Sequence, residues 1–425
     1  MVKDCKYTSY VDSGLQWVGS IPASWRMVPN KRVMHKEKRI CEKWKNEDIM
    51  SLTMNGVVIR DLEAGGKMPS TFDGYQYVNN GELLMCLFDI DVTPRCVGRV
   101  THSGITSPAY SCFVLDRGDV GYYYYYYLMM DNTKELLHLA KNLRHSFTED
   151  QLGMLKVPFP PVDEQKKIAE VLDCEIEKID VIIQQSQYIV EEYREWKKAL
   201  IHQCVTKGLN RKREMKESGV QWIGKIPASW SLRKLKYGFE IVSGATPKSE
   251  NAEYWDGDIN WITPADYKTE EKYVASGRRK ITEAGYDSCG TTMVPEGSII
   301  FSKRAPVGTV AINTAPVCTN QGCLSCIPKL SSDAEYYYYA MSVFSEQFEL
   351  FSSGTTFKEI SASAFGDFVL PFPNINEQRE IAKYLDNECS KMDSIIKEKL
   401  SLIEDLLSYK NSLIYEVVTG KRRVV

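Results

Sequence analysis

The stretch SGLQWVGSIPASW, at residues 13–25, decides how this chain is organised, because it recurs as SGVQWIGKIPASW at residues 218–230. The two copies differ only at Leu15/Val220, Val18/Ile223 and Ser20/Lys225. Chance does not produce a match of this length, and self-similarity at a fixed spacing is typical of a repeated structural unit. We therefore expect two tandem copies of one unit.

A second pair of segments supports the repeat. PFPPVDEQKKIAEVLD at 158–173 matches PFPNINEQREIAKYLD at 371–386. The copies are 205 residues apart at Trp17/Trp222 and 213 apart at Gln165/Gln378, so the second copy holds a net insertion of eight residues. The tyrosine runs at 122–127 and 336–339, and the segments that begin at 107 and 320, are aligned at an offset of 213. This alignment places the insertion between about residues 25 and 107 of the first copy.

Length and composition bound the class of protein. A chain of 425 residues predicts two to four domains, and 43% hydrophobic with 26% charged residues is typical of a soluble protein. The first ten residues, MVKDCKYTSY, contain no apolar run, and no stretch approaches eighteen uninterrupted apolar residues. The twelve cysteines follow no spaced framework. We expect reduced thiols and a cytoplasmic location.

Charge is distributed unevenly along the chain. The net charge of −3 argues against an evenly basic, nonspecific binder of nucleic acid. Local basic clusters nevertheless occur at 211–213, 278–280, 303–304 and 421–423. Each cluster alone is compatible with a solvated loop, so its significance depends on the surrounding architecture.

Each copy continues into a long helical pattern. Apolar residues recur at alternating steps of three and four, which is the spacing of a heptad seam. A run of about forty residues spans roughly 60 Å as a helix. The predicted seam residues, in register between the copies at an offset of 213, are Ile168, Leu172, Ile179, Ile182, Ile189 and Leu200 with Ile381, Leu385, Met392, Ile395, Leu402, Leu406 and Leu413. The polar positions Glu175/Glu388 and Ser186/Lys399 also coincide.

Two helices of equal length most simply pack on each other. If a pseudo-two-fold axis relates the copies, the helices run antiparallel and form a coiled coil. The alternative is that each helix only completes the core of its own domain. The chain also resembles a circle cut once, because the linker after the first helix and the two chain ends have the same kind of sequence.

The two repeated motifs, followed by long helices that exit through Val-Thr, resemble the specificity (S, HsdS) subunit of type I restriction-modification systems. The resemblance covers essentially the whole chain. It implies two target recognition domains that each read half of a bipartite DNA sequence, separated by helices that set the spacing and dock two methyltransferase subunits. Two restriction subunits join through the complex. Catalysis, S-adenosylmethionine and ATP are expected in those partners, with no cofactor in this chain and no membrane.

We find no motif for catalysis. The sequence contains neither Asn-Pro-Pro-Tyr nor Asp-Pro-Pro-Tyr, and no phosphate-binding Gly-x-x-x-x-Gly-Lys-Ser/Thr. The pair Cys323 and Cys326, with Cys318 nearby, admits a zinc site or a buried strand, and we expect the strand and no metal. Glu164-Gln165-Lys166 resembles a nuclease Glu-x-Lys, but its twin at 377–379 also lies at a helix start, where a carboxylate favours the helix dipole.

The tyrosine runs admit two interpretations. They could stack on unpaired bases, but the apolar residues that follow both runs favour core packing. DNA contacts are expected instead from the irregular segments, because Arg and Lys suit guanine or phosphate while Asn and Gln suit adenine. The candidates are Lys67, Arg95, Arg99, His102, Tyr110, Arg144 and His145 in the first copy, and Lys248, Lys268, Arg278, Arg279, Lys303, Arg304, Asn320, Gln321 and Lys358 in the second.

The predicted fold is α+β, with two tandem target recognition domains related by a pseudo-two-fold axis and two long helices packed as an antiparallel coiled coil. Its predicted boundaries are 1–158 and 208–371 for the recognition domains, and 159–207 and 372–425 for the helices. The predicted function is a non-catalytic subunit that reads double-stranded DNA. The alternatives are a single-chain restriction-methylase, which requires the missing motifs, and a coiled-coil scaffold that binds only protein.

Overall fold

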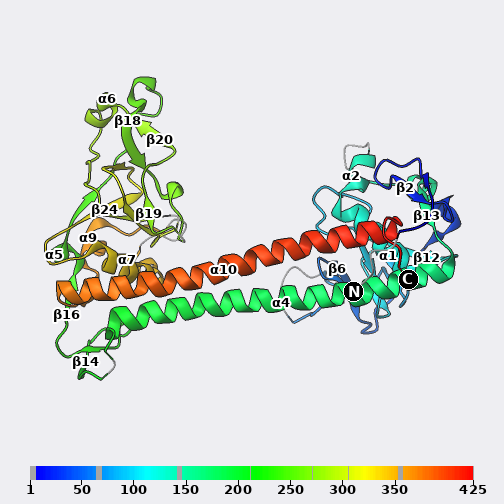
Figure 1. Cartoon of the computed structure of the whole chain (residues 1–425), viewed down its shortest axis with the longest axis horizontal. Coiled ribbons are helices and arrows are strands. Elements are labelled where there is room, and N and C mark those ends of the chain that lie inside the picture. Colours follow the sequence, from blue (N-terminus) through cyan, green and yellow to red (C-terminus); the bar gives the residue numbers. More distant parts are fainter. Residues whose placement is uncertain are drawn as a thin grey trace. The chain divides into compact units, whose positions relative to one another are not determined.

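The computed structural model describes residues 6–63, 69–140, 146–210, 212–269, 271–304, 306–352 and 358–424. The chain forms two compact units (Figure 1). Unit 1 comprises Met1–Gln187 and Leu400–Val425, and unit 2 comprises Tyr188–Lys399. Each unit therefore joins one globular part to portions of both long helices, whereas the sequence-based boundaries treat each helix as a separate segment.

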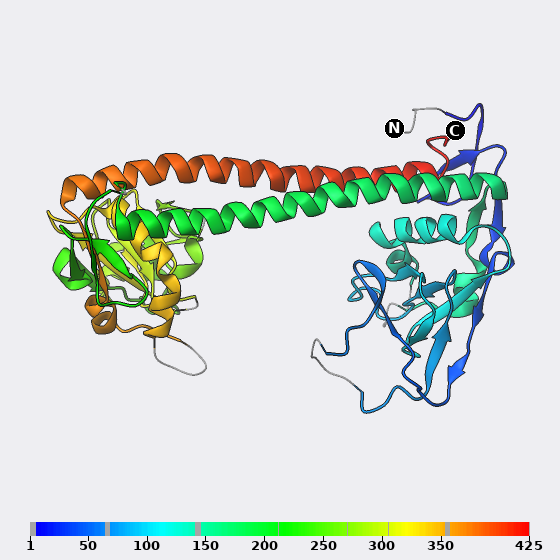
Figure 2. The same ribbon diagram turned by 90° about the horizontal axis from the view of Figure 1, so that it is seen from below.

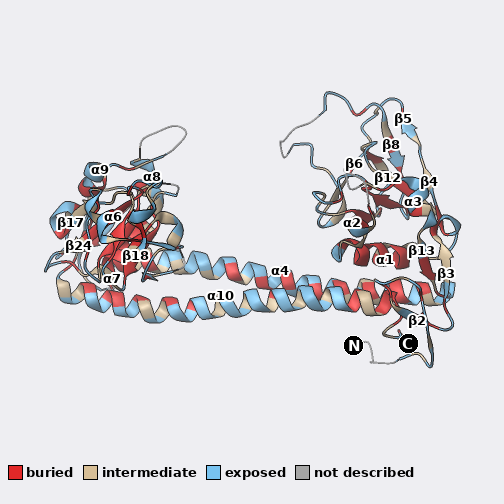
Figure 3. Cartoon of the chain, turned by 90° about the horizontal axis from the view of Figure 1, so that it is seen from above, coloured by how far each residue is buried: buried red, intermediate tan, exposed pale blue. Residues whose placement is uncertain are grey.

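Unit 1 places one helix between its sheets and the long helices. In Figure 3, helix α1 is coloured mostly as buried and lies between the strands of this unit and the long helices. The elements of the globular part are β1 (Tyr10–Asp12), β2 (Ser20–Pro22), β3 (Arg26–Pro29), η1 (Asn30–Arg32), β4 (Met34–Glu37), β5 (Ile40–Cys41), β6 (Ile49–Thr53), β7 (Gly56–Ile59), β8 (Tyr75–Val78), β9 (Leu83–Met85), β10 (Val97–Arg99), β11 (Gly104–Thr106), β12 (Ser111–Leu115), α1 (Val120–Asn132), α2 (Glu135–Leu139), α3 (Glu149–Met154) and β13 (Lys156–Phe159).

The globular part of unit 2 repeats this order with different contents. Its elements are β14 (Met215–Glu217), β15 (Lys225–Pro227), β16 (Ser231–Lys234), α5 (Leu235–Gly238), β17 (Phe239–Ser243), η2 (Ala252–Tyr254), β18 (Trp255–Ile262), η3 (Pro264–Asp266), β19 (Tyr273–Val274), β20 (Arg279–Ile281), α6 (Glu283–Asp287), β21 (Ile299–Ser302), β22 (Val310–Asn313), β23 (Cys318–Thr319), β24 (Cys323–Pro328), α7 (Ala334–Val343), α8 (Ser345–Leu350), α9 (Ala362–Asp367) and β25 (Val369–Phe372).

The sheets show what the two copies share and where they diverge. The hairpin β1-β2 corresponds to β14-β15, and the pair β13-β3 corresponds to β25-β16. The main sheet is β10-β9-β12-β4 in unit 1 and β19-β22-β21-β24-β17 in unit 2, where β19 is added at one edge. The second sheet has five strands in unit 1, β5-β8-β11-β6-β7, but three in unit 2, β20-β18-β23. The two copies therefore diverge mainly in this second sheet.

The tyrosine runs form core helices, which confirms core packing over base stacking. Tyr122, Tyr123, Tyr126 and Tyr127 on α1 are fully buried, and Tyr336–Tyr339 on α7 are at most 8% exposed. Burial raises the pKa of Tyr338 to about 12, so its hydroxyl stays neutral. The structure corrects the alignment by one residue, because the helix caps Asp119 and Asp333, which accept from Tyr122 N and Tyr336 N, are 214 residues apart.

The repeated motifs meet at the start of each long helix. Glu164 accepts a hydrogen bond from the indole Nε1 of Trp25 at 3.2 Å, and Glu377 accepts one from Trp230 at 2.9 Å. The expected interaction of these carboxylates with the helix dipole is therefore accompanied by a specific tertiary contact. That contact explains why the last tryptophan of the first motif and the glutamate of the second motif recur together.

The glutamines next to these glutamates make the same hydrogen bonds in both units. Gln165 accepts from the backbone N–H of Asp119 and donates to the carbonyl of Pro160, each at 2.8 Å. Gln378 repeats this with Asp333 and Pro373, at 2.8 and 2.9 Å. Both side chains are fully buried. Each amide therefore satisfies buried backbone groups and links the tyrosine helix to the long helix.

The long helices are α4 (Val162–Lys207) and α10 (Ile375–Val418). Within unit 1, Lys410 of α10 donates to Asp180 of α4 at 2.6 and 2.8 Å. Within unit 2, Lys197 of α4 donates to Asp393 of α10 at 2.7 Å. The portions of the two helices in each unit are antiparallel and lie side by side in both views (Figures 1 and 2). This is the packing that the heptad pattern predicts.

The buried face of the helices differs partly from the predicted seam. Ile168, Leu172 and Ile179 are buried on α4, and Ile381, Leu385, Met392 and Leu413 are buried on α10. Ile182, however, is 43% exposed, and Ile189, Leu200, Ile395, Leu402 and Leu406 are only partly buried. The buried stripe instead passes through Ile176, Ile183, Val190 and Ile201, and through Cys389 and Ile403. The prediction that Ile182 lies in the seam is therefore wrong, since the buried stripe passes through the next residue, Ile183.

Candidate nucleic-acid interface

In unit 2, four loops converge beside the second sheet. Asn320 N donates to the carbonyl of Ile262, Ala245 N donates to Thr319, and Lys303 N donates to Gly322, at 2.9 to 3.0 Å. A Cβ on Gly244 would lie 2.1 Å from the Thr319 carbonyl oxygen, so these loops touch through their backbones. We name the group of residues 243–248, 262–268, 302–304 and 319–322 the loop cluster.

Two of the predicted DNA-contact residues, Asn320 and Gln321, lie on the loop cluster, and a hydrogen bond orients the side-chain amide of each. Asn320 Oδ1 accepts from the backbone N–H of Gly322 at 2.9 Å. Gln321 is exposed, and its Oε1 accepts a hydrogen bond from the Thr246 hydroxyl. Among the described residues, the side-chain N–H groups of Asn320 and Gln321 make no hydrogen bond, and an amide held in this way can donate and accept at an adenine edge.

A basic strand end adjoins the loop cluster. Arg278 is 75% exposed and donates to Asp266 at 3.1 Å. Although burial acts to raise it, hydrogen bonds from Thr263 and Arg278 hold the pKa of Asp266 below its ordinary value. Arg279 lies over the Trp255 ring at 3.6 Å from its centroid. Lys248, Lys268 and Lys280 are exposed and make no ion pair among the described residues. Lys280 is absent from the predicted candidates, although the 278–280 cluster contains it.

Other predicted basic residues of unit 2 already have acidic partners. Lys303 pairs with Glu359 at 2.9 Å, and Arg304 approaches the same carboxylate at 4.0 Å. Lys358 pairs with Glu349 at 2.8 Å. These charges are partly neutralised by the protein itself. Of the predicted candidates in unit 2, Lys248, Lys268, Arg279 and Gln321 are therefore the ones best placed to meet a ligand.

In unit 1, two predicted arginines act within the fold. Arg99 donates to both oxygens of Asp173 on α4, at 3.1 and 3.0 Å, and this carboxylate also accepts from Tyr125 at 2.6 Å. Arg95 donates to the buried Asp131 at 3.1 Å and to Asn132 at 2.8 Å. A bidentate ion pair fixes the orientation of a guanidinium. The structure therefore gives Arg95 and Arg99 an internal role.

The remaining candidates of unit 1 are spread over several places. His102 is exposed and Tyr110 is half-buried. The Tyr110 carbonyl and the Ser107 carbonyl accept from the buried Gln76 amide at 2.7 and 3.0 Å, which holds the segment equivalent to 320–323. Lys67, Arg144 and His145 lie outside the described residues. The described first-copy candidates do not form one cluster.

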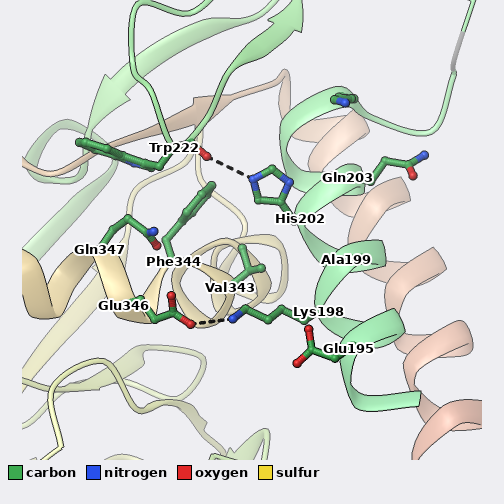
Figure 4. Close-up of a pocket in the computed structure, with 11 residues that line it drawn as sticks. Glu195, Lys198, Ala199, His202, Gln203, Trp222, Val343, Phe344, Glu346 and Gln347 are labelled. Carbon is green, nitrogen blue, oxygen red and sulfur yellow. Dashed lines mark hydrogen bonds and ion pairs between the residues drawn. The ribbon is translucent and has the colours of Figure 1, made fainter. Parts of the chain in front are cut away.

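Unit 2 also contains an open cavity of about 510 Å³ where the end of α4 meets the tryptophan motif. Figure 4 shows His202 beside Phe344, with its Nε2 3.2 Å from the Trp222 carbonyl oxygen. On the same side, Lys198 donates to Glu346 at 2.6 Å. That hydrogen bond holds the pKa of Glu346 below its ordinary value. The cavity is lined by residues that fix the helix end.

The cysteines of the predicted zinc alternative lie in separate cores. Cys323 and Cys326 belong to different hydrophobic clusters on opposite faces of β24, and Cys318 belongs to a third. Burial raises the pKa of Cys323 to about 12, so the thiol keeps its proton at neutral pH. In the described residues, no three His, Cys, Asp or Glu side chains are grouped to hold a metal. None of the described helices has the length and apolar character needed to cross a membrane.

Taken together, the fold and the loop cluster define a protein with two copies of one α+β recognition domain on long helices, with different polar surfaces on the two copies. A family model for the type I restriction modification DNA specificity domain matches residues 97–190 and 227–405, which fall in both copies. The chain belongs to this family.

Several relatives carry the same description. The MjaIX specificity subunit of Methanocaldococcus jannaschii is 40% identical over 188 residues, which are 42% of this chain and 44% of that protein. The putative MjaX specificity subunit of the same organism is 29% identical over 283 residues, 66% of this chain and 62% of that protein. The HindI specificity subunit of Haemophilus influenzae is 27% identical over 43% of this chain and 40% of its own length. The chain thus spans less than two thirds of each relative.

Solved structures share the fold over nearly the whole chain. A chain from a structure on complex assembly and conformational transition of the type I R-M system has a TM-score of 0.72 at 14% identity, covering 94% of this chain and 98% of that one. The HsdS subunit from Thermoanaerobacter tengcongensis has a TM-score of 0.53 at 16% identity, with the same coverage. These likenesses confirm the predicted fold class of two tandem recognition domains with long helices.

Proposed function

We propose that this protein is the DNA-reading specificity subunit of a type I restriction-modification complex. The observation that carries the proposal is the match of the specificity-domain family to both copies, at 97–190 and 227–405. Two different second sheets on one shared frame suit the reading of two different half-sites. In unit 2 the loop cluster and the strand end at 278–280 supply amides for base edges and cations for phosphates.

We place catalysis in partner subunits. Two methyltransferase subunits bind S-adenosylmethionine and modify the DNA in this proposal, and two restriction subunits use ATP. The long helices separate the two recognition domains and dock the methyltransferase subunits, and the complex works in the cytoplasm. The lack of a methyltransferase sequence motif in this chain, together with the specificity-subunit relatives, supports this division of labour.

The test is methylation by the chain with and without a methyltransferase partner. The proposal expects the pair to methylate a bipartite motif with a fixed unspecified spacer, while this chain alone methylates nothing. Methylation by the chain alone would instead identify a single-chain restriction-methylase. Complex formation without any sequence-selective DNA binding would identify a protein-binding scaffold.

A further inference from the structure

The end of each long helix closes the globular part of the other copy. The Tyr122 hydroxyl of the first copy donates to the carbonyl of Val418, at the end of α10, at 2.9 Å. The Tyr336 hydroxyl of the second copy donates to the carbonyl of Val205, at the end of α4, at 3.0 Å. We call the receiving surfaces seat 1, around Tyr122, and seat 2, around Tyr336. Each seat thus receives a helix that belongs to the other repeat.

Many contacts of this closure are the same in both units. The pairs Asp180–Lys410 and Asp393–Lys197 occupy equivalent positions, since Asp180 and Asp393, and likewise Lys197 and Lys410, are 213 residues apart. Because of this repetition, two first halves from different copies of the chain could form the same ion pairs with each other. Shared contacts therefore do not determine which halves associate.

A second set of contacts differs between the seats. In seat 1, Asn132 Nδ2 donates to Asn411 Oδ1 at 2.8 Å. At the equivalent place in seat 2, Lys198 donates to Glu346 at 2.6 Å. A neutral amide pair in one seat corresponds to an ion pair in the other.

Each helix end carries one further donor that the other helix end lacks. Lys421, beyond the end of α10, donates from Nζ to the carbonyls of Val18, at 2.8 Å, and Ser20. Desolvation lowers the pKa of this half-buried ammonium. The residues after α4 at this place are Gly208 and Leu209, which carry no cation. In seat 2, His202 bonds the Trp222 carbonyl at 3.2 Å, whereas α10 carries Tyr415 at the equivalent position.

We propose that the two seats select their helix ends, so that a first half of this chain associates with a second half rather than with another first half. If α4 entered seat 1, Lys198 would face Asn132 in place of Glu346, and the Lys421 contacts would be lost. If α10 entered seat 2, Asn411 would face Glu346 and leave that carboxylate without its cation. The selection preserves two different recognition domains in one molecule, and it does not depend on DNA binding.

The test begins with the intact folded chain carrying a specific protease site inserted after Asn210. The chain is cut, unfolded in urea and refolded, and native mass spectrometry weighs the pairs of halves. We expect mixed pairs to exceed the statistical mixture. The substitution Asn132→Glu places in seat 1 a carboxylate equivalent to Glu346 of seat 2. A dimer of two first halves would then contain two ion pairs between this glutamate and Lys198. Exposed ion pairs of this kind predict a rise of that dimer of roughly 2-fold to 25-fold.

The matched control is Glu191→Gln, which removes an ion pair with Arg194 on the surface of α4, away from both seats. It should leave the distribution unchanged. A statistical mixture from the unmodified chain, or an N132E chain with no additional dimer of first halves, overturns the proposal.

A second measurement on the uncut chain decides the matter if refolding fails. Lys198→Glu and Glu346→Lys should each lower the Tm, and the double variant should recover most of the loss because the ion pair is restored with reversed signs. Single variants without effect, or a double variant that only adds the two losses, would show that seat 2 does not recognise Lys198.

Discussion

At the scale of single residues, the two buried glutamines are the most informative side chains. Gln165 and Gln378 each accept from a backbone N–H and donate to a proline carbonyl within a buried junction. The repeated Glu-Gln pair does not predict these hydrogen bonds, because the backbone partners of each glutamine are distant in the chain or precede the helix. Their recurrence reflects a structural requirement of the repeat.

The first prediction concerns Gln378→Leu. The leucine would leave the Asp333 N–H and the Pro373 carbonyl buried without partners, at about 1–3 kcal/mol for each group. We expect the free energy of unfolding of unit 2 to fall by roughly 2–6 kcal/mol, measured by urea denaturation. Gln221→Leu, at an exposed position of unit 2, is the matched control and should change stability little. Equal effects of the two substitutions would contradict the role assigned to Gln378.

The second prediction concerns Lys268, which is exposed and makes no ion pair among the described residues. If Lys268 contacts a phosphate, Lys268→Ala should weaken DNA binding evenly over all sequences. The slope of log affinity against log salt should become shallower by about 0.9, the value for one lost phosphate contact. Binding titrations at several salt concentrations measure this slope. Lys391→Ala, on α10, serves as control, and an altered base preference in K268A would contradict a phosphate role.

At the scale of elements, the position and length of the long helices could be predicted, but the face that each helix buries could not. Steps of three and four continued from Leu172 lead to Ile182, whereas the structure buries Ile176 and Ile183. The sequence carries apolar side chains at both Ile182 and Ile183, so spacing alone cannot choose between them. Packing against the partner helix makes the choice.

The ends of the helices were also predictable only in part. Val205 accepts from Tyr336, so this part of α4 is a tertiary contact rather than a free spacer. A four-residue insertion between Val205 and Lys207 would displace that contact before it changed any spacing. A test of the helices as a ruler therefore needs insertions at the boundary between the units.

The third prediction places a seven-residue insertion in α4 between Gln187 and Tyr188 and another in α10 between Lys399 and Leu400. Each helix gains about 10 Å while its heptad face is nearly preserved. We expect the spacer of the methylated motif to lengthen by about three base pairs, with both half-sites unchanged. Methylome sequencing reads the outcome. An insertion in α4 alone is the control and should abolish assembly, while a changed half-site with an unchanged spacer would refute the ruler.

At the scale of the whole molecule, the repeat and the antiparallel arrangement of the helices could be predicted from the sequence, whereas the residues through which each helix end contacts the other copy could not. Two copies of one motif predict two domains, but no local pattern shows that Val418 closes the first copy and Val205 the second. The candidate DNA contacts show the same limit. Arg95 and Arg99 were chosen as basic residues in divergent segments, and only the structure shows Asp131 and Asp173 already bound to them.

The fourth prediction concerns exchange of one recognition domain. Strand β3 pairs with β13, with Arg26 opposite Phe159, so the exchanged segment should run from Arg26 to Phe159 and keep this pair together. Replacement by the matching segment of another specificity subunit should change one half of the methylated motif and preserve the other. Reinsertion of the native segment is the control. A change in both halves would mean that the two domains do not read independently.

The last prediction uses the position of the chain ends within unit 1. Lys421 binds the carbonyl of Val18, and Arg423 lies 5.7 Å from the centroid of the Tyr7 ring, so the residues next to the two termini are neighbours. The stretch after α4 follows Gly208, whose φ of +70° ends the helix. Joining Val425 to Met1 through a short Gly/Ser linker and opening the chain after Asn210 should therefore keep both seats intact.

The permuted chain should bind its methyltransferase partner in gel filtration and direct methylation to the same motif as the original chain. The physical reason is that both helix ends still reach their seats, since Tyr122 and Tyr336 keep their partners Val418 and Val205. Opening the chain instead within α1, after Tyr126, is the control and should prevent folding, because that helix forms the buried core of unit 1. A permuted chain that folds but reads a different motif would show that the order of the halves, and not the pairing at the seats, determines which half-sites are joined.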